Sequence, residues 1–202
     1  YTAAKRLRSD DAYTPEGKAG QRPDYAVTVY TKILKEIYPD IPVIIGGIEA
    51  SLRRVTHYDY WQDALKPSVL VESGADWLCY GMGERTMIEF TRAIESGRNL
   101  NDIRKIPQLA FYMDGRCRTK DAVILNSFER CCKDKVAFAE NFHVIETYAN
   151  MLQPPVLVEP CGKGYVQINP TWPPATPQEM DSFWDLPFTK LPHPRYKGKH
   201  IP

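Results

Sequence analysis

Two short apolar segments that end in glycines constrain the fold of this sequence more than any other feature. Val43-Ile44-Ile45 runs directly into Gly46-Gly47, and the segment 77–80 runs into Gly81-Met82-Gly83. Runs this short and apolar suit strands that are buried on both faces of a sheet. Their first residues lie about 34 positions apart, which matches a βαβ unit because parallel strands need a crossover connection. The sequence therefore predicts an α/β fold.

Helical periodicity surrounds these two segments. Asp24 can cap a helix, and apolar residues then recur at helical spacing. These residues are Val27, Tyr30, Ile33, Leu34 and Ile37. A second helix is expected over 85–96, with Gly97 as its C-terminal cap. Residues 49–67 are interpreted as a loop with one or two short helices.

The second half of the chain has a different character, because eleven of the 17 prolines lie from Pro154 onward. Its patterns predict a strand, one long helix, a hairpin around Gly162 and Gly164, and a short helix before a proline-rich tail. The expected ranges are 108–113, 127–151, 156–158 with 165–168, and 178–184. We expect a Rossmann-like α/β region over 1–113 and a small α+β, proline-rich extension over 114–202.

Two parallel strands are too few for a stable parallel sheet. We therefore expect that strands are missing upstream of Tyr1 or are supplied by a partner chain. An incomplete sheet has an open edge, which predicts a route to self-association.

Composition excludes several classes of protein. The 26 Lys and Arg residues balance 25 Asp and Glu residues without a basic stripe, which argues against a nucleic-acid partner. No apolar run approaches the ~20 residues of a membrane span, and the first residues lack a signal-peptide core. Five cysteines in no framework spacing and without a CxxC pair favour a reducing cytoplasm. The four histidines are scattered, so no metal site is expected.

The glycine segments are candidates for cofactor binding, through Gly46, Gly47, Gly81, Gly83 and Glu84. Open α/β sheets bind ligands at the carboxyl ends of their strands, and glycine lets a ligand approach the backbone. The alternative is a tight turn at each glycine pair, with Glu84 as a partner of the helix dipole. If the two strands are neighbours, the two loops should lie together.

A polar and aromatic segment provides the candidate catalytic residues. These are Glu49, Arg53, Arg54, His57, Tyr58, Asp59, Tyr60 and Trp61. If this segment is helical, Glu49 and Arg53 pair at i,i+4, and His57 and Trp61 share a face. Such a cluster can recognise an anionic group or a partner domain. The alternative is a surface helix with buried aromatic rings and ion pairs.

Several of these segments, in this order, resemble the YgiQ-type radical S-adenosylmethionine (SAM) protein family. The resemblance is carried by Ser9–Pro15, Gly46–Arg54, His57–Trp61, Tyr80–Arg85, Asp185–Thr189, His193–Tyr196 and Lys199–Pro202. It implies a segment of a longer cytoplasmic enzyme, with more α/β structure before it. It also implies a radical SAM barrel after it, where a CxxxCxxC motif holds a [4Fe–4S] cluster that binds SAM.

This sequence contains no CxxxCxxC motif. The chain is therefore expected to stop short of it, to bind no cofactor itself and to be inactive alone. Its role would be to shape the substrate side of the barrel or the interface between domains. The substrate, a small molecule or a peptide, stays undefined.

The α/β region also resembles the cobalamin-binding type of domain that precedes the barrel in related enzymes. The DxHxxG motif of cobalamin ligation is absent, so tight cobalamin binding is not expected. Two other functions stay open. One is a binding domain without chemistry that holds a nucleotide-like or corrin ligand, and the other is a scaffold or interaction module.

Overall fold

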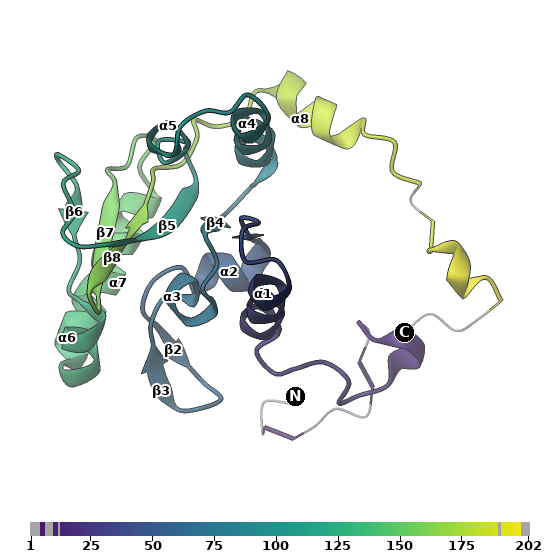
Figure 1. Ribbon diagram of the computed structural model, residues 1–202, viewed down its shortest axis with the longest axis horizontal. Helices are drawn as coiled ribbons and strands as arrows, with labels where there is room; N and C mark the ends of the chain where they lie inside the picture. Colours follow the sequence, from purple (N-terminus) through teal and green to yellow (C-terminus); the bar gives the residue numbers. More distant parts are fainter. Residues whose placement is uncertain (1–4, 7–9, 12, 190, 199–202) are drawn as a thin grey trace. The chain divides into compact units, whose positions relative to one another are not determined.

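The computed structural model describes residues 5–6, 10–11, 13–189 and 191–198. They belong to two compact units, one over 27–175 and the other formed by 1–26 together with 176–202. The larger unit contains a six-stranded sheet in the order β1-β4-β5-β8-β7-β6 (Figure 1). Its strands are β1 (Ile44–Ile45), β4 (Trp77–Cys79), β5 (Leu109–Asp114), β6 (Val123–Ile124), β7 (Leu157–Cys161) and β8 (Gly164–Ile168).

The parallel pairing of the two glycine-terminated strands is confirmed, because Ile44 pairs with Trp77 and Ile45 with Leu78. The sheet as a whole is mixed, which corrects the expectation of a parallel sheet. Strand β5 runs antiparallel to both β4 and β8, and β7 and β8 form the predicted hairpin. Only β6 adds a second parallel pair, with β7. An apolar run shows that a strand is buried, but it does not encode the direction of its neighbour.

Helices cover both faces of the sheet. They are α1 (Ala26–Ile37), α2 (Gly47–Leu52), α3 (Val69–Ser73), α4 (Glu84–Glu95), α5 (Leu100–Ile103), α6 (Phe128–Lys133) and α7 (Lys135–Ala149). The predictions of α1 and α4 are confirmed, and Gly97 follows α4 with a φ of 66°. None of the helices in the described part of the chain combines the length and apolar character that crossing a membrane requires.

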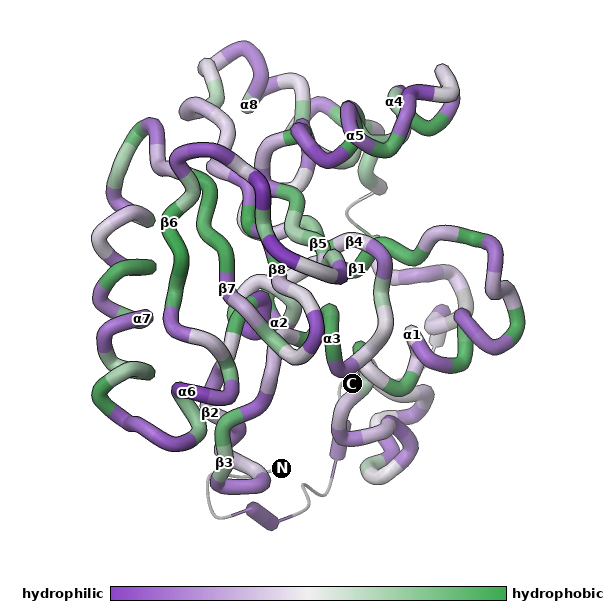
Figure 2. The backbone as a smooth tube through the Cα atoms, turned by 60° about the vertical axis from the view of Figure 1, so that its left-hand side comes forward, coloured by the Kyte–Doolittle hydropathy of each residue, from purple (hydrophilic) through white to green (hydrophobic). Residues whose placement is uncertain are grey.

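Alternation along the strands creates two cores. Leu78 of β4 packs with Ile45, Ala50 and Leu70 in one core, which α7 also covers. Its neighbour Trp77 packs into the other core with residues of α4 and α5. In Figure 2 the hydrophobic colour is concentrated on strands such as β6 and β7. Successive side chains of a strand point to opposite faces, so one short strand supplies both cores.

The long helix expected over 127–151 is two helices, because the chain is extended at Asp134 (φ −136°, ψ 106°). The Asp134 side chain accepts a hydrogen bond from the backbone N–H of Val136 and caps the start of α7. Apolar periodicity continues across this break, which is why the sequence suggested one helix.

The expectation of one or two helices in 49–67 is confirmed only for its first residues, in α2. The remainder forms an antiparallel hairpin of β2 (His57–Asp59) and β3 (Ala64–Lys66). His57 and Asp59 are buried while Tyr58 between them is exposed, as the two-residue period of a strand requires. His57 and Trp61 therefore share no helix face.

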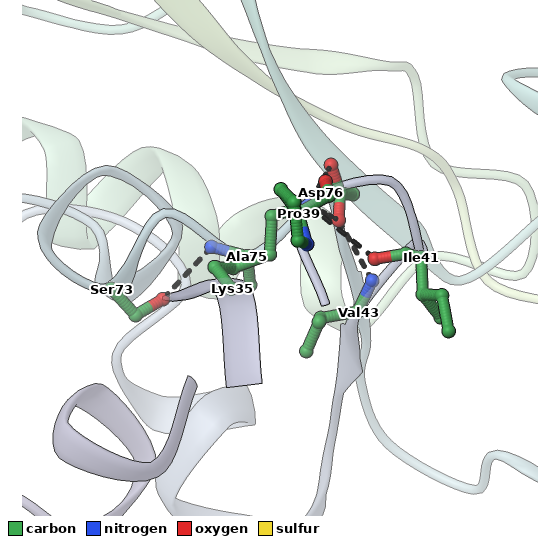
Figure 3. A network of polar contacts seen from close by, with 7 residues as sticks. All are labelled: Lys35, Pro39, Ile41, Val43, Ser73, Ala75 and Asp76. Carbon is green, nitrogen blue, oxygen red and sulfur yellow. Dashed lines mark hydrogen bonds and ion pairs between the residues drawn. The ribbon is translucent and has the colours of Figure 1, made fainter. Parts of the chain in front are cut away.

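At the amino ends of β1 and β4, the carboxylate of Asp76 accepts hydrogen bonds from two donor groups (Figure 3). One is the backbone N–H of Val43 at 2.7 Å and the other is Lys35 Nζ at 3.0 Å. Lys35 lies in the last turn of α1, so this network fixes the end of that helix beside the two parallel strands.

The smaller unit contains a 3-10 turn at Pro15–Gly17, the helix α8 (Pro177–Trp184) and a second 3-10 turn at Pro194–Tyr196. The prediction of α8 is confirmed, and a capping box between Thr176 and Glu179 begins it. Parts of the segments that carry the family resemblance, at 9, 12 and 199–202, lie outside the described residues.

Candidate functional site

The two glycine loops meet at the carboxyl ends of β1 and β4. The Ser51 hydroxyl joins them, because it donates to the carbonyl of Gly47 at 2.8 Å and accepts from the N–H of Gly81 at 3.2 Å. We call this surface the glycine edge. It consists of Gly46, Gly47, Ser51, Arg54, Tyr80, Gly81 and Gly83. The expectation that the two loops lie together is thus met by the geometry.

Packing accounts for part of this glycine pattern. A Cβ on Gly46 would lie 3.3 Å from the carbonyl oxygen of Cys79, and one on Gly83 would lie 3.0 Å from Cys79 Sγ. Gly47 has a φ of 81° and nothing within 4 Å of its Cβ position. Gly46 and Gly83 are thus required by the end of β4, whereas the backbone at Gly47 borders open space. Glu84 is exposed in the first turn of α4.

Arg54 stacks on Tyr80 within the glycine edge. Its Cζ atom lies 5.1 Å from the ring centroid of Tyr80, and its Nη1 donates to the carbonyl of Ser51 at 2.5 Å. The Tyr80 hydroxyl donates to the carbonyl of Asn169, and burial raises its pKa to about 12. Burial likewise lowers the pKa of the Arg54 guanidinium. The ring therefore stays neutral, and it holds the cation in place.

A second group of candidate residues surrounds the β2–β3 hairpin, and we call it the hairpin cluster. Arg53 pairs with Glu49 at 3.0 Å, as its i,i+4 spacing predicted, and its Nη2 lies 4.0 Å from Asp59 Oδ1. The cluster consists of Glu49, Arg53, His57, Asp59, Lys66 and Glu72. Lys66 pairs with Glu72 at 2.7 Å. These charges compensate one another, which favours a structural role for the inner face of the hairpin.

His57 and Glu72 each have one buried side-chain atom without a hydrogen-bond partner among the described residues. The Nδ1 of His57 donates to the carbonyl of Val55 at 3.1 Å, while its buried Nε2 has no hydrogen-bond partner in the described part of the chain. Burial is the main cause that lowers the pKa of His57, so the ring is neutral at pH 7. Tyr58 and Tyr60 are exposed on the outer side, and Trp61 is partly buried.

The structure thus separates the candidate catalytic residues. Arg54 belongs to the glycine edge, while Glu49, Arg53, His57 and Asp59 belong to the hairpin cluster. Sequence reasoning missed Ser51 as the link between the loops and Tyr80 as the support of Arg54. It also missed Glu159 on β7, whose buried carboxylate accepts from the backbone N–H of Thr56 at 2.8 Å. No local pattern in the sequence marks a contact between positions this far apart.

The cysteines in the described part of the chain are free thiols that form no metal-binding group. No group of three or more His, Cys, Asp or Glu residues within the described ranges is arranged to hold a metal ion. Burial raises the pKa of Cys131 and of Cys161 to about 11 in each case, so both are thiols at pH 7. Cys79 is buried beneath the glycine edge, as a small apolar residue would be.

Comparison with known proteins identifies the family of this mixed α/β domain. The family described as Radical SAM N-terminal matches residues 1–202, and the chain belongs to it. A UPF0313 protein of Porphyromonas gingivalis is 47% identical over all of this chain, which covers 32% of that protein. One from Bacteroides thetaiotaomicron is 46% identical over all of this chain and 35% of its own length, and one from Methanocella arvoryzae is 42% identical over 98% and 33%. No solved structure matches the chain.

The chain spans about a third of the length of the curated relatives that it matches. These matches confirm the resemblance to YgiQ-type radical SAM proteins.

Proposed function

We propose that this chain forms the α/β domain of a radical SAM enzyme and that its glycine edge faces the part that carries the chemistry. The family match supports the first half of the proposal. The second half is carried by one observation, the exposure of large apolar side chains around the glycine edge. Ile48 is 82% exposed, Leu52 69% and Met82 54%.

These side chains come from both glycine loops. Ile48 and Leu52 lie one turn apart on α2, and Met82 lies between Gly81 and Gly83. Clustered exposed apolar side chains mark interaction surfaces in soluble proteins. The relatives have about two thirds of their length outside the matched region, which is sufficient to cover this surface.

In this proposal the [4Fe–4S] cluster and SAM are held outside the described residues, since the sequence has no CxxxCxxC motif and the described residues contain no group arranged to hold a metal ion. The cluster, when bound, supplies the electron that cleaves SAM. The residues of this domain would orient the substrate and exclude water. The finer likeness to a Rossmann-like, cobalamin-binding type of domain is supported only by the parallel β1–β4 pair and its two glycine loops.

The proposal predicts a specific loss in the full-length enzyme when Ile48→Glu and Leu52→Glu are combined. Covering two such side chains contributes about 1.5–3 kcal/mol each, so we expect at least about a tenfold loss of reductive SAM cleavage. The packing within the α/β domain should not change, because both side chains are exposed in that domain. The measurement is 5′-deoxyadenosine formed under single-turnover conditions.

The matched control combines Val136→Glu with Phe142→Glu, which places the same two charges on exposed positions of α7. It should leave the activity unchanged. Equal activity of the α2 double variant and this control would refute the assignment of the glycine edge as the interface.

A second function is a binding domain without chemistry, for a nucleotide-like or corrin ligand. The observation that favours it is the open space beside Gly47, next to the start of the 12-residue helix α4. Equilibrium titration with ATP, SAM and hydroxocobalamin tests it. Binding of one of them that Gly47→Val abolishes would support this function, and no binding at high micromolar ligand would exclude it.

A further inference from the structure

Arg54 differs from the other basic side chains near it. Arg53, the preceding residue, forms ion pairs with Glu49 and Asp59. Arg54 is partly buried, and among the described residues it forms no ion pair. Its only hydrogen bond to them is the one donated to Ser51. A guanidinium has five N–H donors, so most of them are left for another acceptor.

The surroundings hold this cation without neutralising it. The Tyr80 ring lies against the guanidinium and is itself fixed at both ends. Its hydroxyl donates to Asn169, and its backbone carbonyl accepts from Gln108 Nε2 at 2.9 Å. The acidic group that attracts Arg54 is Glu146 of α7, which is not within ion-pair distance. Partly withdrawing a charge from water without an ion-pair partner is unfavourable, so an anion that binds at this position would stabilise the site.

The position of Arg54 determines what kind of anion can reach it. The guanidinium of Arg54 donates to the backbone carbonyl of Ser51, whose Oγ links Gly47 and Gly81. It also stacks on Tyr80, the residue directly before Gly81. The open space at Gly47 leaves room next to the backbone. Arginine binds carboxylate and phosphate groups through two parallel N–H donors, which gives orientation as well as affinity.

We propose that Arg54 binds the oxyanion, a carboxylate or phosphate, of a small ligand that lies over the glycine edge. This inference deepens the proposed function, because it names the chemical class of the ligand at that edge, and it rests on that edge facing the reaction site. The ligand oxyanion accepts from the guanidinium, while Tyr80 and Ser51 keep the guanidinium in place.

The test is equilibrium binding to the full-length protein, and it requires no radical chemistry. Inorganic phosphate and citrate are titrated at constant ionic strength, with tryptophan fluorescence and thermal unfolding as readouts. We expect saturable binding of at least one of the two in the millimolar range. Arg54→Gln should weaken it by about tenfold or more, and Arg54→Lys should retain part of it because a point charge remains.

Arg104→Gln is the matched control. Arg104 also stacks on an aromatic ring, Phe111, at 5.8 Å, but it lies outside the glycine edge, so its loss should not change anion affinity. Three results would overturn the proposal. The first is equal anion affinity in the wild type, Arg54→Gln and Arg104→Gln proteins. The second is the absence of saturable binding of either anion to the wild type.

The third result is a lower unfolding temperature of Arg54→Gln in the absence of any anion, together with unchanged anion affinity. That result would mean that an acidic side chain of the protein itself covers Arg54. If Arg54→Gln does not fold, Arg54→Lys still decides between these outcomes. The two proposals can fail separately. If the wild type binds the anion through Arg54 but the α2 double variant retains full SAM cleavage, the glycine edge is not the interface, and the anion site at Arg54 still holds.

Discussion

Alanine in place of Gly164 is expected to destabilise the six-stranded sheet strongly. Gly164 begins β8 and pairs with Asp114 of β5. A Cβ at this position would lie 2.0 Å from the carbonyl oxygen of Met113 and 2.7 Å from the Tyr112 hydroxyl. The carbonyl belongs to β5, so it cannot move without breaking the ladder between β5 and β8. We expect destabilisation by at least about 3 kcal/mol, a large part of the stability of a typical domain.

The matched control is Gly162→Ala in the turn of the same hairpin. Gly162 has a φ of 59° and nothing within 4 Å of its Cβ position, so the substitution adds only backbone strain. Its expected cost is about 1–2 kcal/mol. Urea unfolding followed by circular dichroism measures both variants. Equal stability of the two would show that β5 and β8 are not in the register described here.

The buried carboxyl of Glu159 is expected to make the protein less stable as the pH rises from about 4.5 to about 7. Burial is the main cause that raises the pKa of Glu159 from 4.5 to about 7, and the Thr56 N–H only partly offsets it. The protonated form is favoured in the folded state, so its stabilising contribution is complete below pH 4.5 and is lost as the pH passes 7. The loss amounts to about 3 kcal/mol.

Glu159→Gln should remove this dependence, because the amide has a similar shape and no charge. The quantity to measure is the difference in unfolding free energy between wild type and variant from pH 4 to 8. Taking this difference cancels the contribution of His57, whose lowered pKa produces the opposite slope. Glu95→Gln is the control, since Glu95 is exposed at the end of α4 and does not contribute to the pKa of Glu159. A constant difference across this range would contradict the prediction.

The sequence predicted the elements whose signals are local. Apolar runs that end in glycines identified β1 and β4, and helical spacing identified α1 and α4. Gly162 and Gly164 marked the β7–β8 hairpin. The i,i+4 spacing of Glu49 and Arg53 also predicted the ion pair between them. Each of these signals lies within one element or its caps.

The sequence could not predict relations between distant segments. Nothing in β5 indicates that it pairs antiparallel with β4, or that β8 lies on its other side. The hairpin at 57–66 was missed because its alternation extends over only three residues per strand, which is too short to distinguish from a helix turn. Arg53 and Arg54 are adjacent in sequence and similar in chemistry, yet directly after the end of α2 at Leu52 they belong to different clusters.

The order of strands in the sheet has a consequence for synthesis on the ribosome. Strand β5 lies in the interior of the sheet, yet one of its two neighbours, β8, is translated about 50 residues later. The buried bond between Thr56 and Glu159 joins residues that are 103 positions apart. The nascent chain therefore carries β1, β4 and β5 with an open sheet edge at β5 until the β7–β8 hairpin emerges. Such a topology folds slowly, and it makes protection by chaperones during translation important.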